Sequence, residues 1–122
     1  MPKFGTSSKL NLQSCHEDLQ KVLNLAIKYY DFSVIQGHRT QKDQTYAFDH
    51  GFSQAPWPTS KHNSTPSRAV DVCPYPLDWD DKEEFCFMLG VIEACAKRLG
   101  VELIYGKDWK TLQDYPHIQL KD

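Results

Sequence analysis

Apolar residues recur at intervals of three and four in two stretches of the chain, the spacing of an amphipathic helix. The first stretch starts after Glu17 and Asp18, which suit the first turn of a helix. Its apolar members are Leu19, Val22, Leu23, Ala26, Ile27 and Tyr30. Those of the second stretch are Phe85, Met88, Leu89, Ile92, Ala96 and Leu99. Gly100 is the stop signal of this second helix, and a shorter third helix is predicted between Thr40, as its cap, and Gly51.

Short apolar runs between these helices predict strands over 32–37, 69–73, 101–105 and 117–120. Side chains alternate along a strand, so Val70 and Val72 share one face while Asp71 lies on the other. The valines suit a core, and we therefore expect Asp71 to face a cleft. The order of the elements predicts an α+β fold: one compact domain in which a small antiparallel sheet is flanked by about three helices.

The composition, 40% hydrophobic and 25% charged, is typical of a globular protein. The net charge of −2 provides no broad cationic field, which counts against nucleic acid as a partner. No apolar run has the length of a membrane span, and the start MPKFGTSSKLNLQSCHEDL lacks the apolar stretch of a secretory signal. We expect a monomer made in the cytoplasm, without membrane insertion. The four cysteines lack CxxC spacing and are expected to be reduced and mostly buried.

Metal-ligating side chains gather around a loop rich in Pro, Ser and Asn, from about 53 to 67. A loop of that length in a small domain is usually either functional or disordered. His62 lies on it, Asp71 follows on the cleft face of a strand, and His117 begins the last strand. Two imidazoles and a carboxylate are the ligand set of a zinc site that keeps one position for water. Cys73 is a less favoured ligand, because sulfur would be a fourth protein ligand and close the site.

Asp114 precedes His117 by three residues and can move protons for a metal-bound water. Residues three apart in an ideal strand point to opposite faces. Pro116, however, removes a backbone donor and disfavours helix at Tyr115, so a bend there can bring both side chains to one metal. The competing interpretation is that Asp114 is a turn residue and His117 an ordinary half-buried histidine.

The segments SKHNSTPSRAVDVCPYPLDW (60–79) and DYPH (114–117) resemble the zinc D-alanyl-D-alanine carboxypeptidase and dipeptidase family. That family carries Ser-x-His, Ala-x-Asp and Asp/Glu-x-x-His motifs. The first segment is most similar to the branch of phage endolysins and L-alanyl-D-glutamate peptidases. GHRT (37–40) with the Gln four residues later also matches that branch. GKDW (106–109) is similar to its Gly-Gly-Asp-Trp stretch, with Lys107 where a second Gly is common, and the resemblance runs from about residue 4 to 120.

The resemblance implies that residues 1–122 form a zinc peptidase catalytic domain, which cleaves the L-Ala–D-Glu bond of a cell-wall peptidoglycan peptide with a metal-activated water. His62, Asp71 and His117 would be the zinc ligands. Asp114 would be the general base and later the proton donor to the leaving amine. Arg39 would hold a substrate carbonyl or carboxylate and stabilise the oxyanion.

Two further residues are candidates for the substrate side of this site. Ser60 is expected to fix the loop or the orientation of a ligand, and Trp109 can line the cleft. Trp79 is expected in the core. The sequence departs from the family where Ile118 and Gln119 replace the more usual Phe-Glu, which removes a carboxylate near the site.

Three other functions stay open at this point. A D,D-carboxypeptidase on the same scaffold would remove a terminal D-Ala, and Arg39 could bind its free carboxylate. A non-catalytic zinc module that binds the wall would be expected to lack Asp114, which is present. A metal nuclease would suit the pair His62 and Asn63, but the acidic net charge and the lack of clustered basic residues count against it. A wall-lytic enzyme without a secretory signal would leave the host cytoplasm by a holin-type or lysis route.

Overall fold

The computed structural model describes residues 2–122, in which four α-helices accompany four strands. The helices are α1 (Thr6–Gln13), α2 (Glu17–Ala26), α3 (Gln41–Asp49) and α4 (Lys82–Leu99). The strands are β1 (Phe32–Gln36), β2 (Ala69–Pro74), β3 (Leu103–Tyr105) and β4 (His117–Leu120). Two short 3-10 helices, η1 (Lys61–Asn63) and η2 (Gly106–Asp108), complete the set. The predicted α+β domain, its three helices and its four strands are confirmed.

The sequence did not predict α1. Its segment, TSSKLNLQ, carries few apolar side chains, and only Ser8 and Leu12 of it are buried. The helix is held by tertiary contacts rather than by an amphipathic pattern: the Ser8 hydroxyl accepts a hydrogen bond of 2.9 Å from the backbone N–H of Val34 in β1. Asn11, also in α1, donates from its amide to the backbone carbonyls of Val34 and Ile35.

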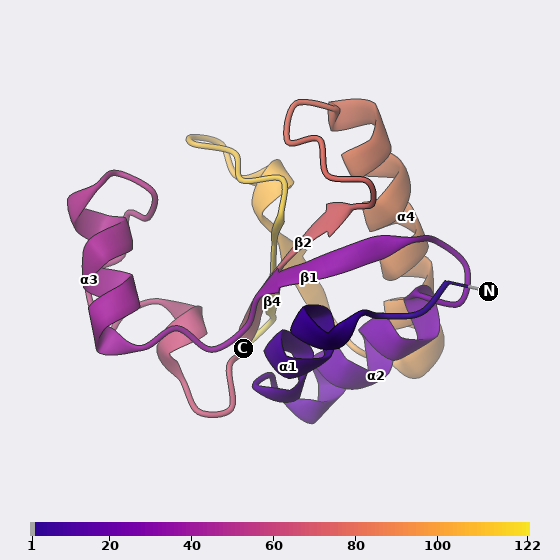
Figure 1. Cartoon of the computed structure of the whole chain (residues 1–122), viewed down its shortest axis with the longest axis horizontal. Helices are drawn as coiled ribbons and strands as arrows, with labels where there is room; N and C mark the ends of the chain where they lie inside the picture. Colours follow the sequence, from indigo (N-terminus) through magenta and orange to yellow (C-terminus); the bar gives the residue numbers. More distant parts are fainter. Residues whose placement is uncertain (1) are drawn as a thin grey trace.

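The sheet is antiparallel throughout, in the order β1-β2-β4-β3 (Figure 1). The inner strand β2 therefore pairs with two strands that are distant in sequence. Its register with β4 places Asp71 directly opposite His117. Its register with β1 is irregular between Val34 and Gln36, next to the point where Gln36 faces Asp71. The ladder itself thus sets two of the expected metal ligands side by side.

The core lies between the sheet and the helices α2 and α4, which pack against each other. Val70 and Val72 are fully buried there, as their strand alternation predicts. Other fully buried members are Leu19, Val22, Leu23, Ala26, Met88, Ile92, Ala96 and Ile118. Figure 1 shows α4 and α3 at opposite ends of the molecule, and Gln44 is the only buried residue of α3. One end of the molecule is therefore formed by the core helix α4, while α3 and the loop that follows it form the other end (Figure 1).

The expectation that Trp79 lies in the core is wrong. Its side chain is 52% exposed and stacks on Phe85, the first buried residue of α4, at a centroid distance of 6.3 Å. Trp79 covers the end of the core instead of filling it, because the segment that carries it runs outside α4. The cysteines agree with expectation: all four are free thiols, and all but Cys86 are buried. None of the helices between residues 2 and 122 combines the length and apolar character needed to cross a membrane.

Two glycines of α4 provide a matched test of what ends this helix. A Cβ at either position would meet open space, but Gly90 lies inside the helix while Gly100 ends it at φ 73°. We expect Gly90→Ala to raise the free energy of unfolding by about 0.5–1 kcal/mol, because alanine restricts the unfolded chain. Gly100→Ala should lower it by about 1–2 kcal/mol, because a Cβ is strained in the left-handed conformation. Urea unfolding measures both, and shifts of the same sign would contradict this explanation.

Candidate metal centre and cleft

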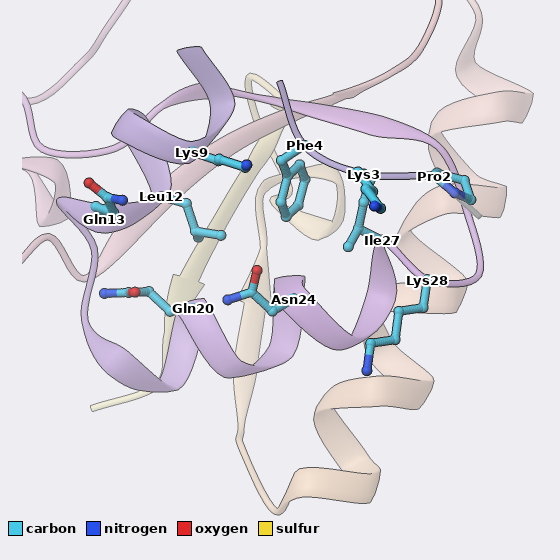
Figure 2. Close-up of a pocket in the computed structure, with 10 residues that line it drawn as sticks. All are labelled: Pro2, Lys3, Phe4, Lys9, Leu12, Gln13, Gln20, Asn24, Ile27 and Lys28. Atoms are coloured by element: carbon cyan, nitrogen blue, oxygen red, sulfur yellow. The ribbon is translucent and has the colours of Figure 1, made fainter. Parts of the chain in front are cut away.

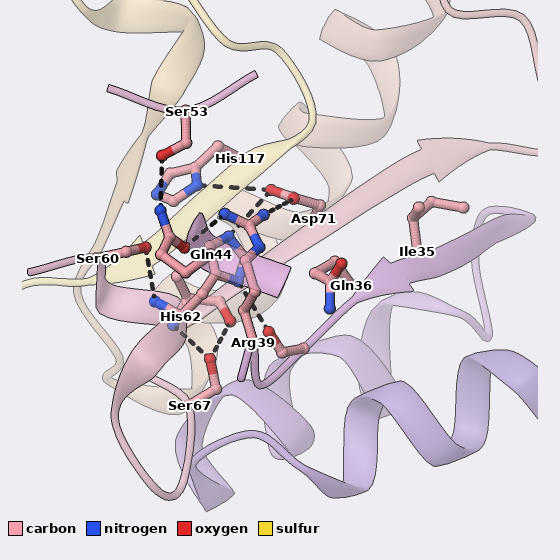
Figure 3. Close-up of polar contacts among 12 residues, drawn as sticks. Ile35, Gln36, Arg39, Gln44, Ser53, Ser60, His62, Ser67, Asp71 and His117 are labelled. Carbon is pink, nitrogen blue, oxygen red and sulfur yellow. Dashed lines mark hydrogen bonds and ion pairs between the residues drawn. The ribbon is translucent and has the colours of Figure 1, made fainter. Parts of the chain in front are cut away.

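Three side chains from three separate elements converge on one point (Figure 3). His62 comes from η1, Asp71 from β2 and His117 from β4. The Asp71 Oδ1 atom lies 3.4 Å from His62 Nε2 and 3.5 Å from His117 Nδ1. Tetrahedral bonds of about 2.1 Å to a zinc ion separate neighbouring ligand atoms by roughly 3.4 Å. The spacing between the carboxylate and each imidazole is therefore the spacing that an ion needs.

Two of these converging atoms have no hydrogen-bond partner. They are His62 Nε2 and Asp71 Oδ1, both completely buried. A buried polar atom without a partner costs about 1–3 kcal/mol, and more when it carries charge. A cation between these atoms would satisfy both at once. The arrangement therefore fits a metal, and Cys73, which is buried in the core, lies outside the group.

The other nitrogen of each imidazole is occupied in a way that selects the tautomer. His62 Nδ1 lies 2.9 Å from the backbone carbonyl of Gly37, to which it donates, so that Nε2 keeps its lone pair. In His117 the two nitrogens exchange roles. Its Nε2 lies 2.8 Å from the Gln119 side-chain oxygen, to which it donates, and this leaves Nδ1 free to bind a metal. Partners of this kind fix the ring orientation of metal-ligating histidines. The partner of His117 is thus the neutral amide of Gln119, at the position where the sequence departs from the Phe-Glu expected by resemblance.

Electrostatics keep Asp71 in the anionic form that a metal ligand requires. Burial alone would raise its pKa, but the adjacent imidazoles of His117 and His62 outweigh burial and hold the pKa well below its usual range. His117 shows the reciprocal effect: burial opposes its charge, yet Asp71 raises its pKa above the ordinary value. His117 must lose this proton to bind a cation, so acid should compete with metal.

The predicted role of Ser60 in fixing the loop agrees with its contacts. Its hydroxyl accepts a hydrogen bond of 3.2 Å from the N–H of His62, and Asn63 accepts one of 3.1 Å from the N–H of Ser60. This reciprocal cap defines the single turn of η1 and so the position of His62. Ser60 also lines the cleft described below.

The predicted bend before β4 is present. The Asp114 carbonyl accepts a hydrogen bond from the N–H of His117, while the N–H of Asp114 donates to Gly106. A Cβ at Gly106 would collide with the Asp114 backbone, so this close approach requires glycine. Burial, and next the charge of Asp71, raise the pKa of the Asp114 carboxyl. Asp114 is thus a better proton acceptor than an ordinary exposed aspartate.

Arg39 lies beside the metal group and is not a surface ion pair. Its Nη2 is 3.5 Å from Asp71 Oδ2, and its Nη1 donates a hydrogen bond of 2.9 Å to the Gln44 side-chain oxygen (Figure 3). The pair is mostly buried, with 13% of the Arg39 side chain exposed. Asp71 contacts the two histidines through Oδ1 and Arg39 through Oδ2. One carboxylate therefore connects the two imidazoles with the guanidinium.

Gln44 is a residue whose role the sequence did not reveal. It is fully buried in α3, and its side-chain oxygen accepts from both Arg39 and Asn63. Its side-chain nitrogen donates to the Ser53 hydroxyl and the Ala55 carbonyl. In the sequence, only the match of this glutamine to the family motif and its place in a short predicted helix could have drawn attention to it. Its contacts tie together Arg39, η1 and the loop after α3.

A cleft of about 640 Å³ lies next to these groups. Asp71, which was expected to face a cleft, is not part of its lining and lies behind the two histidines and Arg39, which it contacts. Arg39, His62, Asp114 and His117 all line the cleft, and so does Trp109. The Trp109 ring lies 5.0 Å from that of His117, as a cleft-lining role predicts. A second hollow, of about 450 Å³, lies between the N-terminal segment, α1 and α2 (Figure 2). Its lining contains no His, Cys, Asp or Glu, so it offers none of this chemistry.

Comparison with known proteins gives one family of relatives. The sequence model of the family described as phage L-alanyl-D-glutamate peptidase matches residues 1–121. The L-alanyl-D-glutamate peptidase of Escherichia phage T5 is 36% identical over 126 residues, covering 98% of this chain and 89% of that protein. The crystal structure of the Serratia marcescens L-Ala D-Glu endopeptidase ChiX is similar with a TM-score of 0.84 and 32% identity, over 98% of this chain and 90% of that one.

The contacts of Gln44 predict a measurable cost when they are removed. Gln44→Leu keeps the side-chain size but leaves Arg39, Asn63 and the Ala55 carbonyl without their partner. We expect the free energy of unfolding to fall by about 1–3 kcal/mol. Gln41→Leu, at an exposed position of the same helix, is the control and should change it by less than about 0.5 kcal/mol. Equal changes of the unfolding free energy for the two variants, in thermal or urea unfolding, would show that the hydrogen bonds of Gln44 do not stabilise the protein.

Proposed function

Because the chain belongs to the phage L-alanyl-D-glutamate peptidase family, we propose that it is a zinc-dependent endopeptidase that hydrolyses the L-Ala–D-Glu bond of peptidoglycan. The observation that carries the zinc dependence is the convergence of His62, Asp71 and His117, with two buried ligand atoms that have no other partner. The catalytic domain extends over residues 1–122 in this proposal.

The three ligands would hold zinc through His62 Nε2, an Asp71 oxygen and His117 Nδ1. They are nitrogen and oxygen donors, three in number, which is the donor set of catalytic zinc sites. Bound zinc would polarise the scissile carbonyl and lower the pKa of a bound water toward about 7. The carbonyl of Gly37 and the amide of Gln119 keep the two rings turned to the metal. Ser60 positions His62 through its cap on η1.

Asp114 is the general base in this proposal. Its carboxyl lines the cleft beside His117, and its raised pKa favours uptake of a proton from the attacking water. The same carboxyl then returns that proton to the nitrogen of the leaving D-Glu. Retention of this second carboxylate favours an enzyme over a module that only binds zinc and wall peptide.

Arg39 and Trp109 are proposed to bind the substrate. Arg39 lines the cleft, and each of its two Nη atoms is engaged by a single protein partner, so donors remain for the substrate. The D-Glu residue carries an α-carboxylate close to the scissile amide, and a planar guanidinium pairs well with such a group. The Trp109 ring can pack against the apolar part of the peptide.

The partner of the enzyme in this proposal is the stem peptide of the bacterial cell wall, which the protein attacks as a monomer. Its relative comes from a phage, which supports delivery from the host cytoplasm to the wall by a holin-type or lysis route.

Metal binding is tested directly by the stoichiometry of zinc. The wild-type chain should hold one zinc after dialysis at neutral pH, whereas His62→Ala and His117→Ala should each lose it. Asp114→Asn is the matched control and should keep it, because Asp114 is proposed as a base and not as a ligand. Acidification should release the metal, since the raised pKa of His117 favours its protonated form. Elemental analysis and titration against a chelator measure both effects. A folded wild-type chain without zinc would refute the site.

The cleaved bond is tested by mass spectrometry of digested, purified peptidoglycan. We expect fragments with a new D-Glu amino terminus and a stem peptide freed from the glycan strand. Asp114→Asn should slow this release by on the order of 10²–10⁴, the usual contribution of a general acid or base. Loss of only a terminal D-Ala would instead identify a D,D-carboxypeptidase.

A further inference from the structure

The helix α3 forms one end of the molecule (Figure 1). Three aromatic rings of α3 and the residues that follow it lie close together. Tyr46 and His50 are one helical turn apart, with ring centroids at 3.9 Å and an angle of 22° between the planes. Phe52 lies 6.3 Å from His50 at 13° and 6.4 Å from Tyr46 at 33°. Tyr46 and His50 therefore cover one face of each other, and Phe52 stands beside this pair. The cluster of these three rings, with the ring faces that stay exposed, is here called the aromatic platform.

The platform is not part of the hydrophobic core. Tyr46 is 58% exposed and Phe52 75% exposed, and His50 is exposed as well. The buried residue that attaches α3 to the protein is Gln44, so these rings are not needed to anchor the helix. Exposed apolar groups gathered in one place are a common mark of an interaction site.

The platform is continuous with the proposed catalytic cleft. Phe52 itself lines the cleft, together with Gly51 and Ser53 on the same loop. The same lining includes Arg39, Asp114 and His117. A substrate whose peptide occupies the cleft can therefore extend onto the rings of Phe52, His50 and Tyr46 without leaving the protein surface.

The chemistry of the proposed substrate supplies an occupant for this surface. L-Ala is the first residue of the stem peptide, joined to the sugar through the lactyl group of muramic acid. With the L-Ala–D-Glu bond at the metal, the sugar is separated from it by one residue, a reach of about 3.5 Å, plus that short linker. The glycan must therefore lie beside the cleft. Its N-acetylated sugars are uncharged, and their C–H faces suit the negative faces of aromatic rings.

We propose that the platform of Tyr46, His50 and Phe52 binds the glycan strand of peptidoglycan by stacking sugar rings on its aromatic faces. This rests on the proposed function, because it takes the cleft to hold the stem peptide. The platform adds a specificity for glycan-linked peptide over free peptide, without a contact to the reacting atoms.

The experiment compares two substrates of the zinc-loaded enzyme. One is a disaccharide muropeptide with an intact L-Ala–D-Glu bond, and the other is the same stem peptide, N-acetylated and without sugar. Tyr46→Ala should lower kcat/KM for the muropeptide about three- to tenfold more than for the free peptide, the loss expected for one stacking contact. Tyr46→Phe keeps the ring and should restore the preference. Tyr29→Ala, which removes a tyrosine that is 64% exposed outside the cleft lining, should leave the ratio unchanged.

A measurement of oligosaccharide binding tests the aromatic platform independently of the proposed peptidase activity. In NMR spectra, an oligosaccharide of N-acetylglucosamine should shift the signals of residues 46–52 in wild type and not in Tyr46→Ala. Equal losses on both substrates, or no shifts at 46–52, would overturn the platform. Failure of the wild type to cleave either substrate would refute the proposed function, while the oligosaccharide titration would still decide whether the platform binds glycan.

Discussion

One buried carboxylate, that of Asp71, organises the whole functional end of the protein. A charge taken out of water is tolerated only when it is paired or bound to a metal. Asp71 faces His62 and His117 through Oδ1 and Arg39 through Oδ2, so all three side chains share contact with one carboxylate. The carboxylate stands in the middle of the inner strand β2, where the ladder to β4 leaves little freedom.

The groups around Asp71 are positioned by different interactions, which depend on the element that carries each group. His117 is placed by the strand register, and His62 by the reciprocal cap between Ser60 and Asn63. Asp114 is placed by a backbone bend that packs closely on Gly106. Hydrogen bonds made to the backbone, by other backbone groups or by side chains, thus position each of these three groups. Such support matters because a metal site or a proton transfer tolerates only small displacements.

Much of this could be predicted from the sequence where periodicity or spacing was strong. The apolar repeats identified α2 and α4, and the alternation around Asp71 identified its face of β2. The prediction for Trp79 failed because the size of an aromatic ring does not by itself show that the ring is buried. The helix α1 was not predicted because it is held by polar contacts and has few buried apolar residues. The candidate ligands were found through their motif, and the structure brings them together. The partners that orient them, the carbonyl of Gly37 and the amide of Gln119, depend on folded neighbours that no local pattern reveals.

The short helix α3 connects the metal centre with the aromatic platform. A nine-residue helix is marginal in isolation, so its order depends on its cap and on tertiary contacts. Thr40 caps its start, and Gln44 secures its inner side through Arg39, Asn63 and the loop that leads to Phe52. The residue that accepts a hydrogen bond from Arg39 therefore also attaches α3, the helix that carries Tyr46, to the rest of the protein. A single inward glutamine thereby couples the guanidinium proposed to bind the peptide with the rings proposed to bind the glycan.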